Sequence, residues 1–347
     1  MSLTDPTIAM RQGETLDVAA LDRELKTHLP DLTGTPEVTQ FPGGASNLTY
    51  RLAYPDQVLI LRRPPHGPLP KGAHNMVREA ELMQALHPHY PKAPSVRLIV
   101  TDSPLLGCDY YVMRAIPGLI LRRTPPTDLS ADQCRHLCQV FINGLAELHR
   151  IDVSETRLSA LGKGEGYIKR QVTSWTERLA RAHTPDVPAF DDVGLWLAQH
   201  QPKEQPACLI HNDYRFDNLV LDPSDFQVRG VLDWELATLG DPLMDLGTAL
   251  AYWVEAGDHP AMLAIRPQPT HLSGMLTREE LVAAYFDARG LTPVDFRFYS
   301  VFGLFRLAGI LQQIYARFYH GQTQDKRFAG FGTVVAHLHQ RCHELTD

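Results

Sequence analysis

The main change in the hydrophobic pattern of this chain lies close to Pro117 and Gly118. On the N-terminal side, short apolar stretches alternate with polar residues or are rich in β-branched and aromatic side chains, which is typical of strands. On the C-terminal side, apolar residues recur at the three- and four-residue spacing of amphipathic helices. A chain with strands in one part and helices in the other is expected to form an α+β fold of two lobes.

The first 120 residues predict a small antiparallel sheet with one main helix, over 75–86. The expected strands cover residues 38–41, 47–54, 57–62, 96–101 and 110–116. Turn residues at 42–46 and 55–56 connect the first three strands as a meander. Apolar positions within 14–29 indicate a short amphipathic helix that precedes the sheet.

The remainder of the chain predicts a mostly helical lobe. Helices are expected over 130–149, 167–182, 190–199, 242–255, 277–289, 294–319 and 328–345. Ser130 is placed to cap the first of these, and Thr277 with Glu280 forms a capping box. The segment 207–234 interrupts the helices with three short apolar runs separated by polar loops, which indicates short strands that carry loop residues.

Composition excludes several classes of protein. The 347 residues are 44% hydrophobic with a net charge of −7, which argues against a disordered chain or a nucleic-acid-binding protein. Five cysteines without a C-x-x-C pair argue against a disulfide framework or a zinc ribbon and fit a reducing compartment. Without a signal-like N-terminus or a long apolar run, we expect a cytoplasmic protein that does not span a membrane.

Two features near the C-terminus contain metal-binding residue types. His337 and His339 are two positions apart, and Cys342 and His343 are adjacent, on a predicted helix. Residues one or two positions apart do not share a helix face. We therefore interpret these side chains as surface residues.

Carboxylates and one amide follow the apolar runs of the interrupting segment. The first run leads into His211-Asn212-Asp213-Tyr214-Arg215-Phe216-Asp217-Asn218, and the third leads into Leu232-Asp233-Trp234-Glu235. Phosphoryl transfer requires a carboxylate that accepts a hydroxyl proton and oxygen ligands that hold Mg²⁺ against nucleotide phosphates. This interpretation makes Asp213 the base and Asn218 and Asp233 the metal ligands. The alternative is that the aspartates cap turns through their side chains.

From about residue 36 onward, these motifs resemble the aminoglycoside phosphotransferase and choline kinase superfamily, whose fold is like that of protein kinases. The resemblance implies an N-terminal arm and helix over 1–35, a nucleotide-binding lobe over 36–117 and a catalytic and acceptor-binding lobe over 118–347. It implies ATP and Mg²⁺ as cofactors. By the same resemblance Asp213 is the catalytic aspartate, Asn218 and Asp233 are magnesium ligands, and Arg215 lies near the transferred phosphate. Asp241 and Asp245 match acidic residues that brace the catalytic loop.

A kinase also needs groups that hold the nucleotide phosphates. The predicted turn between the first two strands has small residues that let backbone amides approach phosphate oxygens, with Gly43, Gly44, Ser46 and Asn47 as candidates. A plain hairpin turn is the alternative. Arg62, at the end of the third strand, is expected to pair with Glu79 of the following helix, at a position where the superfamily usually has lysine.

The predicted strand 110–116 is placed where such folds join their lobes. Backbone groups of Arg114 and Ile116 are expected to meet the adenine edge, with Met113 behind it. A buried strand without a ligand role is the alternative.

Two observations bear on the identity of the acceptor: the charge of the C-terminal segment and a resemblance to one branch of the superfamily. Residues 293–347 contain six basic and four acidic side chains, a net charge of +2, which favours an anionic acceptor over a cationic one if those charges face the cleft. The phrases at 58–65 and 232–242 resemble kinase-like domains fused to, or encoded beside, acyl-CoA dehydrogenases. That resemblance implies phosphorylation of a hydroxyacyl-CoA and a functional link to such a dehydrogenase. An aminoglycoside or choline-type kinase and a non-catalytic nucleotide- or acyl-CoA-binding module remain the alternatives, and neither nucleic acid nor membrane is expected as a partner.

Overall fold

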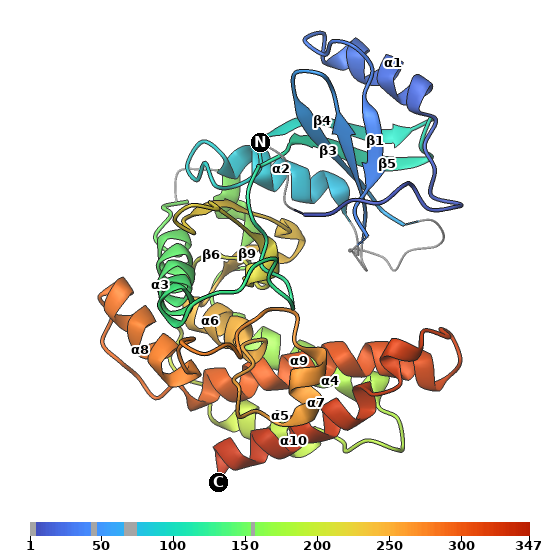
Figure 1. Cartoon of the computed structure of the whole chain (residues 1–347). Helices are drawn as coiled ribbons and strands as arrows, with labels where there is room; N and C mark the ends of the chain where they lie inside the picture. Colours follow the sequence, from blue (N-terminus) through green and yellow to red (C-terminus); the bar gives the residue numbers. More distant parts are fainter. Residues whose placement is uncertain (1–4, 43–46, 66–74, 154–156) are drawn as a thin grey trace. The chain divides into compact units, whose positions relative to one another are not determined.

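The chain forms two compact units, as seen in a computed structural model that describes residues 5–42, 47–65, 75–153 and 157–347. The N-terminal unit contains the described residues up to Ile120 together with Asn218–Leu236. The C-terminal unit contains most of the remaining residues. The predicted α+β class is confirmed, because the first unit is built on an antiparallel sheet and the second is mostly helical (Figure 1).

The N-terminal unit is a five-stranded antiparallel sheet with the order β1-β2-β3-β5-β4. Its strands are β1 (Glu37–Gln40), β2 (Leu48–Ala53), β3 (Val58–Arg63), β4 (Val96–Ser103) and β5 (Cys108–Arg114). The predicted meander of the first three strands is therefore confirmed. Strand β5 ends at Arg114, two residues earlier than predicted. The backbone amide of Ala115, the next residue, still donates to the carbonyl oxygen of Val58.

The two-residue alternation along β3 gives the sheet two different faces. Leu59 and Leu61 are buried in one hydrophobic cluster with the leucines of α1 (Val18–His28), so the short amphipathic helix predicted over 14–29 covers that face. Arg62 points to the opposite face, where its guanidinium contacts Glu79 of α2 (Met76–Leu86). The alternation thus directs a positive charge toward α2.

The strands β7 (Leu219–Leu221) and β8 (Val228–Val231) form an antiparallel ribbon that belongs to the N-terminal unit. Leu119 pairs with Leu221, and the Val231 amide donates to the carbonyl oxygen of Lys92. Trp234, in the short 3-10 helix η3 (Trp234–Leu236), meets the Tyr90 ring edge-on at 6.2 Å. The lobe bounds proposed from the sequence assign this ribbon to residues 118–347, whereas its packing groups it with the sheet.

The C-terminal unit contains eight α-helices among the described residues. They are α3 (Ala131–Leu148), α4 (Tyr167–Ala182), α5 (Asp191–Gln199), α6 (Pro242–Ala251), α7 (Pro260–Ile265), α8 (Arg278–Arg289), α9 (Arg297–Tyr319) and α10 (Phe331–Thr346). Ser130 and Thr277 form the predicted N-terminal caps, both as complete capping boxes. The strands β6 (Cys208–Ile210) and β9 (Thr238–Gly240) pair with each other. Three further 3-10 helices are η1 (Arg157–Leu161), η2 (Phe216–Asn218) and η4 (Lys326–Phe328).

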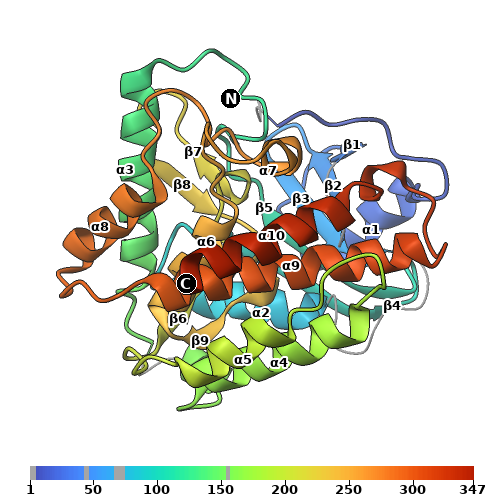
Figure 2. The same cartoon turned by 90° about the horizontal axis from the view of Figure 1, so that it is seen from below.

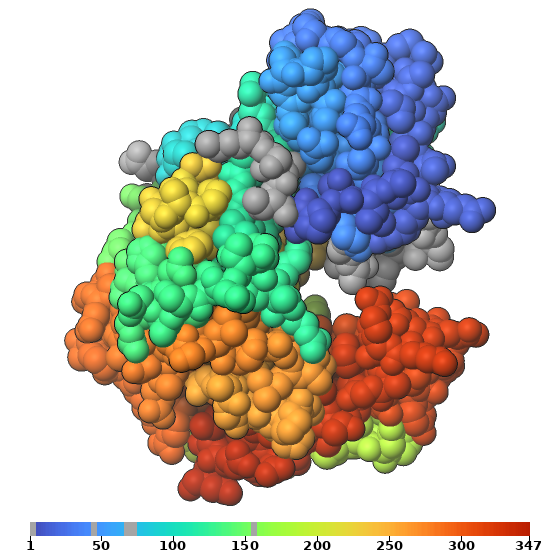
Figure 3. Space-filling model, viewed as in Figure 1, coloured from blue at the N-terminus to red at the C-terminus, as the bar shows by residue number. Residues whose placement is uncertain are grey.

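Helix α9 is the centre of this unit. It packs against α10, α6 and α4, and Figure 2 shows α9 and α10 side by side with α4 and α5 next to them. At the crossing of α6 and α9, a Cβ atom on Gly303 would lie 2.2 Å from the carbonyl oxygen of Gly247, so both positions require glycine for this approach. The orange segment around α7 forms a broad part of the unit's visible surface in Figure 3. Within the described residues, no helix is long and apolar enough to cross a membrane.

Candidate active site

A buried charge cluster joins three elements of the N-terminal unit. Arg62 of β3 donates from Nη1 to Glu79 Oε1 of α2 at 2.8 Å and from Nη2 to Asp233 Oδ1 at 3.0 Å. The expected pair of Arg62 and Glu79 is therefore present. The Glu79 side chain is 0% exposed and that of Arg62 is 11% exposed, so water screens this pair little.

Burial and charge act against each other in this cluster. Burial disfavours the charged form of Arg62, but the carboxylates of Glu79 and Asp233 outweigh it and hold the pKa of Arg62 above its ordinary value. Burial raises the pKa of Glu79, and the Arg62 guanidinium opposes that rise. Arg62 is therefore a permanently charged group near the end of the central strand β3, where it can meet anionic oxygen atoms.

The two predicted metal ligands lie at the same end of the β7–β8 ribbon. Asn218 directly precedes β7, Asp233 follows β8 by two residues, and the Leu232 amide donates to the Asn218 carbonyl oxygen at 2.8 Å. Asp233 has a φ of +67°, a left-handed conformation that is uncommon for residues other than glycine. An amide oxygen and a carboxylate are hard donors of the kind that Mg²⁺ prefers, so this pair fits that ion.

Glu235 is a further acidic residue of this cluster that sequence reasoning did not assign. Its Oε2 accepts from Asn47 Nδ2 at 3.4 Å, and its backbone carbonyl accepts from Arg78 at 2.9 Å. Burial, reinforced by the carboxylates of Asp233 and Glu79, raises the pKa of Glu235 to about 7. In the sequence, the signal that could have assigned Glu235 to the site was its position two residues after Asp233.

The segment after β5 contains the residues predicted to meet adenine. The Arg114 amide donates to the Ser95 carbonyl oxygen at 2.9 Å, and the Ala115 amide donates to Val58 at 3.0 Å. Ile116 lies against Gly230, where a Cβ atom would come 2.6 Å from the Ile116 Cδ1 atom. Of the two predicted residues, Arg114 therefore has its backbone amide engaged within the sheet.

The catalytic-loop motif begins in the C-terminal unit, directly after β6. Asp245 of α6 holds this loop: its Oδ1 accepts from the Asn212 amide at 2.7 Å and its Oδ2 from the His211 amide at 2.8 Å. Asn212 has a φ of +64°, and the His211 ring accepts a hydrogen bond from the Asp213 amide at 3.2 Å. The bracing role expected for Asp245 is thereby confirmed, and the loop has a defined turn that presents Asp213.

A buried histidine supports Asp245 from behind. His149 is hydrogen-bonded through Nδ1 to the Tyr285 hydroxyl at 2.6 Å and through Nε2 to Asp245 Oδ2 at 3.1 Å. Burial lowers the pKa of His149, against the opposing effect of the Asp245 carboxylate. We assign a neutral ring that accepts from the tyrosine and donates to the carboxylate. Asp241, the other predicted brace, caps α6 and accepts from the Gln205 amide.

Arg215 lies between two carboxylates of the same loop. Its Nε atom is 3.2 Å from Asp213 Oδ1 and 3.3 Å from Asp217 Oδ1, and its guanidinium carbon stands 4.6 Å from the centre of the Tyr252 ring. Burial raises the pKa of Asp217, and the charge of Arg215 opposes that rise. These contacts orient Arg215 and the carboxylate of Asp213 relative to each other.

The structure thus assembles the predicted residues in two groups. The N-terminal unit brings together Arg62, Glu79, Asn47, Asn218 and Asp233, and the C-terminal unit pairs Asp213 with Arg215. Gly43, Gly44 and Ser46 lie outside the described residues. Asn47 is buried at the start of β2, and its side chain contacts Glu235 instead of facing solvent.

Comparison with protein-family models identifies the family of this chain. A model described as "Phosphotransferase enzyme family" matches residues 37–299, which include every predicted site residue. The chain belongs to this phosphotransferase family. The match begins at the first strand of the sheet and ends in α9, so it covers the charge cluster and the catalytic loop.

Parts of longer curated proteins are similar to this chain. It is 35% identical to acyl-CoA dehydrogenase family member 10 of Mus musculus over 92% of its own length and 30% of that protein. It is 32% identical to acyl-CoA dehydrogenase family member 11 of Gallus gallus over 100% of its length and 45% of that protein. The chain therefore spans less than half the length of these curated relatives.

Solved structures show the same fold. A protein from Ralstonia eutropha JMP134, described as a candidate aminoglycoside phosphotransferase, is 28% identical, with a TM-score of 0.80 over 95% of this chain and 98% of that one. Choline kinase from Cryptosporidium parvum is 11% identical, with a TM-score of 0.64 over 94% and 96%. The phosphotransferase fold predicted from the sequence is thus confirmed.

Proposed function

We propose that this chain is an ATP- and Mg²⁺-dependent phosphotransferase that phosphorylates a hydroxyl group of a small molecule. The observation that carries this proposal is the cluster of Arg62, Glu79 and Asp233, because it joins a fixed positive charge to a carboxylate of the kind that can hold Mg²⁺. Such a combination is what positioning of nucleotide phosphates requires. Family membership supports the reaction class.

In the proposed reaction the acceptor oxygen forms a bond to the γ-phosphorus of ATP while the bond from that phosphorus to the bridging oxygen of ADP breaks. Asp213 accepts the hydroxyl proton, and Arg215, held between Asp213 and Asp217, offsets negative charge on the transferred group. Arg62 offsets charge on the phosphates that remain with ADP. Mg²⁺ supplies further charge neutralisation at the phosphate oxygens, and Asn218 and Asp233 are the residues that would hold it.

The acceptor pocket we propose lies in the C-terminal unit beside Arg215. A cavity of about 110 Å³ has two guanidinium groups, Arg215 and Arg266, and an otherwise mostly apolar lining that includes Met262, Leu307 and Phe331. Among the described residues, no acidic side chain lines this cavity. An apolar chain with an anionic group matches this lining better than a polycationic aminoglycoside, which would meet the guanidinium of Arg266, whereas that of Arg215 is already paired with Asp213 and Asp217.

The charge of the C-terminal segment does not support that preference by itself. Three of its six basic residues are paired with acidic side chains: Arg297 with Asp295, Arg327 with Asp325, and Arg341 with Asp258. Such pairs neutralise one another locally. The preference for an anionic acceptor therefore depends on the cavity and not on the net charge of +2 that the sequence alone offered.

We propose a hydroxyacyl-CoA as the acceptor class, with the apolar acyl part against the apolar lining of this cavity. The cavity of about 110 Å³ holds only that part of the molecule, so the phosphates of the CoA would lie outside it. The relatives named as acyl-CoA dehydrogenase family members support a functional link to such a dehydrogenase. Choline-type and aminoglycoside acceptors are the competing classes.

The test is an ADP-release screen of the purified chain with ATP and Mg²⁺ against hydroxyacyl-CoAs, aminoglycosides and amino alcohols. We expect turnover with at least one hydroxyacyl-CoA and a product that carries one added phosphate on the acceptor. The matched unhydroxylated acyl-CoA controls for ATP hydrolysis. Thermal stabilisation by ATP without ADP release for any acceptor would instead support a non-catalytic binding module and refute the proposed activity.

A further inference from the structure

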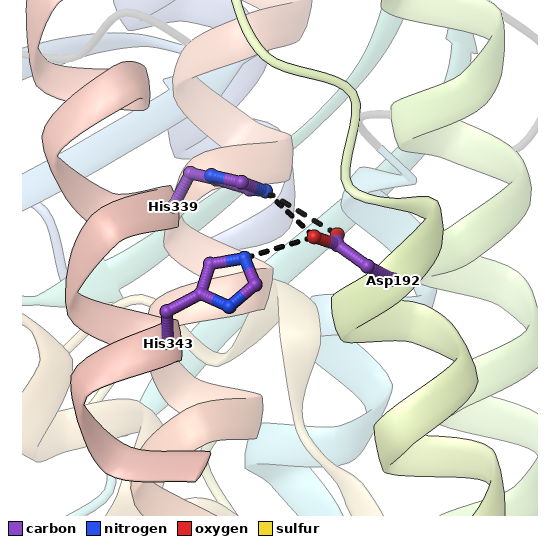
Figure 4. A group of neighbouring side chains, drawn as sticks. All are labelled: Asp192, His339 and His343. Carbon is purple, nitrogen blue, oxygen red and sulfur yellow. Dashed lines mark hydrogen bonds and ion pairs between the residues drawn. The ribbon is translucent and has the colours of Figure 1, made fainter. Parts of the chain in front are cut away.

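Two histidines of α10 and one aspartate of α5 lie close together in the C-terminal unit (Figure 4). His339 and His343 are four positions apart, so they lie on the same face of α10, one turn from each other. Asp192, in the first turn of α5, points toward both rings. The sequence interpretation compared each histidine with neighbours one or two positions away and so missed this pair.

The distances suit a shared cation. Asp192 Oδ2 is 3.2 Å from His339 Nε2 and 2.8 Å from His343 Nε2, and one ligand atom from each residue lies within 4.8 Å of the others. Ligand atoms bound tetrahedrally to zinc at about 2.0–2.2 Å stand roughly 3.3 Å apart. The contacts between Asp192 and the two histidines are close to that spacing, so small side-chain rotations would complete the arrangement.

Neighbouring groups hold two of the three side chains in place. The Val193 amide donates to Asp192 Oδ1 at 2.7 Å, and the Phe190 ring meets the His339 ring edge-on at 4.9 Å. Supporting contacts of this kind orient the ligands of metal sites. Burial acts to raise the pKa of Asp192, but hydrogen bonds from Val193 and His339 outweigh it and keep this pKa below its ordinary value, which favours the ionised carboxylate.

The side chains are open to solvent on one side. Asp192 is 49% exposed, His343 43% and His339 19%. A cation can therefore enter without opening the fold, and a water molecule can complete the coordination. Two imidazoles and one carboxylate form a donor set for zinc and related transition metals, whereas Mg²⁺ prefers oxygen ligands alone.

We propose that Asp192, His339 and His343 form a binding site for a divalent transition-metal ion, with zinc as the first choice. The site bridges the first turn of α5 and the C-terminal half of α10. It thereby cross-links two helices of the C-terminal unit. It is separate from the Asn218 and Asp233 pair proposed for Mg²⁺ and does not depend on the phosphotransferase activity.

The first test is calorimetric titration of the full chain with zinc in the presence of excess Mg²⁺, which occupies oxygen-rich sites. We expect one zinc per chain and a rise in the melting temperature. His339→Ala and His343→Ala should each weaken binding by roughly 100-fold or more, since even changes in groups that support metal ligands cost about 10- to 100-fold. His200→Ala, at the other end of α5, is the matched control and should bind as the wild type does.

Equal zinc affinity in the wild type and in both variants would overturn the proposal. A second measurement needs no variant: nitrogen chemical shifts of the histidine rings in the wild type, recorded with and without zinc. We expect the metal to shift the ring nitrogens of His339 and His343. Zinc-induced shifts confined to other histidines, or no shifts at all, would show that these three residues form a hydrogen-bonded cluster and no metal site.

Discussion

Replacement of Arg62 by methionine tests the energetics of the charge cluster. The substitution keeps much of the side-chain volume but removes the guanidinium that contacts Glu79 and Asp233. The Glu79 side chain is 0% exposed, so its carboxylate would remain buried without its cation. We expect Arg62→Met to lower the free energy of unfolding of this unit by about 3–5 kcal/mol at about pH 8, the usual cost of breaking a buried ion pair.

The size of this loss should depend on pH. Burial already raises the pKa of Glu79, and removal of Arg62 takes away the charge that opposes the rise. A carboxyl whose pKa is raised in the folded state favours folding below its unfolded pKa and loses that advantage as pH rises through the folded pKa. Below the folded pKa, the deficit of the variant should therefore shrink by up to about 1.4 kcal/mol per pH unit.

The assay is urea unfolding of wild type and variant, followed by circular dichroism and fluorescence, near pH 8 and near pH 5.5. Arg51→Met is the matched control, because Arg51 lies on the neighbouring strand β2 and has no such carboxylate contact within the part of the chain that the structure describes. The double variant Arg62→Met with Glu79→Leu should recover most of the lost stability, because the fully buried carboxylate of Glu79 is removed together with its cation, while the Asp233 side chain is 31% exposed. A deficit that is equal at both pH values, or no larger than that of Arg51→Met, would refute this account.

Three further predictions concern the C-terminal unit. Because burial lowers the pKa of His149, this ring takes up a proton below about pH 6.5 only when the protein unfolds. Acidification from about pH 7.5 to 5.5 should therefore lower the free energy of unfolding of the wild type by up to about 1.4 kcal/mol per pH unit. In urea melts His149→Gln should reduce that pH dependence, and His200→Gln should leave it unchanged. Gly303→Ala should lower the free energy of unfolding by about 1–3 kcal/mol or more, because its Cβ atom would lie 2.2 Å from a carbonyl oxygen of α6. Gly257→Ala, with open space around it, is the control. Equal melting temperatures of the two variants would contradict the packing argument. Asp245→Ala should lower turnover by at least about tenfold while ATP affinity is retained, because two loop amides lose their acceptor; unchanged ADP release would remove the bracing role.

Local sequence patterns predicted much of the fold because most elements are long enough to show their period. The cap at Ser130 and the capping box at Thr277 defined helix starts that the structure confirms. The strand β9 was not predicted, since three residues that end in Gly240 contain too little periodicity and depend on pairing with β6. The helix predicted over 242–255 ends at Ala251, where the chain turns through Tyr252.

The candidate site was predicted unevenly for a physical reason. Asp213 and Asp233 follow short apolar strands and Asn218 directly precedes one, and such positions can be read from the chain alone. Glu235 was not assigned, because its role depends on burial beside Asn47, a contact across 188 residues. Asp192 and His339 are 147 residues apart, and no local pattern joins α5 to α10. Contacts of this kind depend on tertiary packing.

The most direct test of the proposed activity follows the γ-phosphate of ATP. The chain is incubated with γ-labelled ATP, Mg²⁺ and the acceptor identified by the ADP-release screen, and label on the acceptor hydroxyl is measured for the wild type and for Asp213→Asn. We predict label transfer by the wild type and a loss of at least about 100-fold in the variant, with ATP affinity preserved, since a general base contributes about 10²–10⁴-fold. Near-normal transfer by purified, folded Asp213→Asn would contradict the role of Asp213 as the catalytic base.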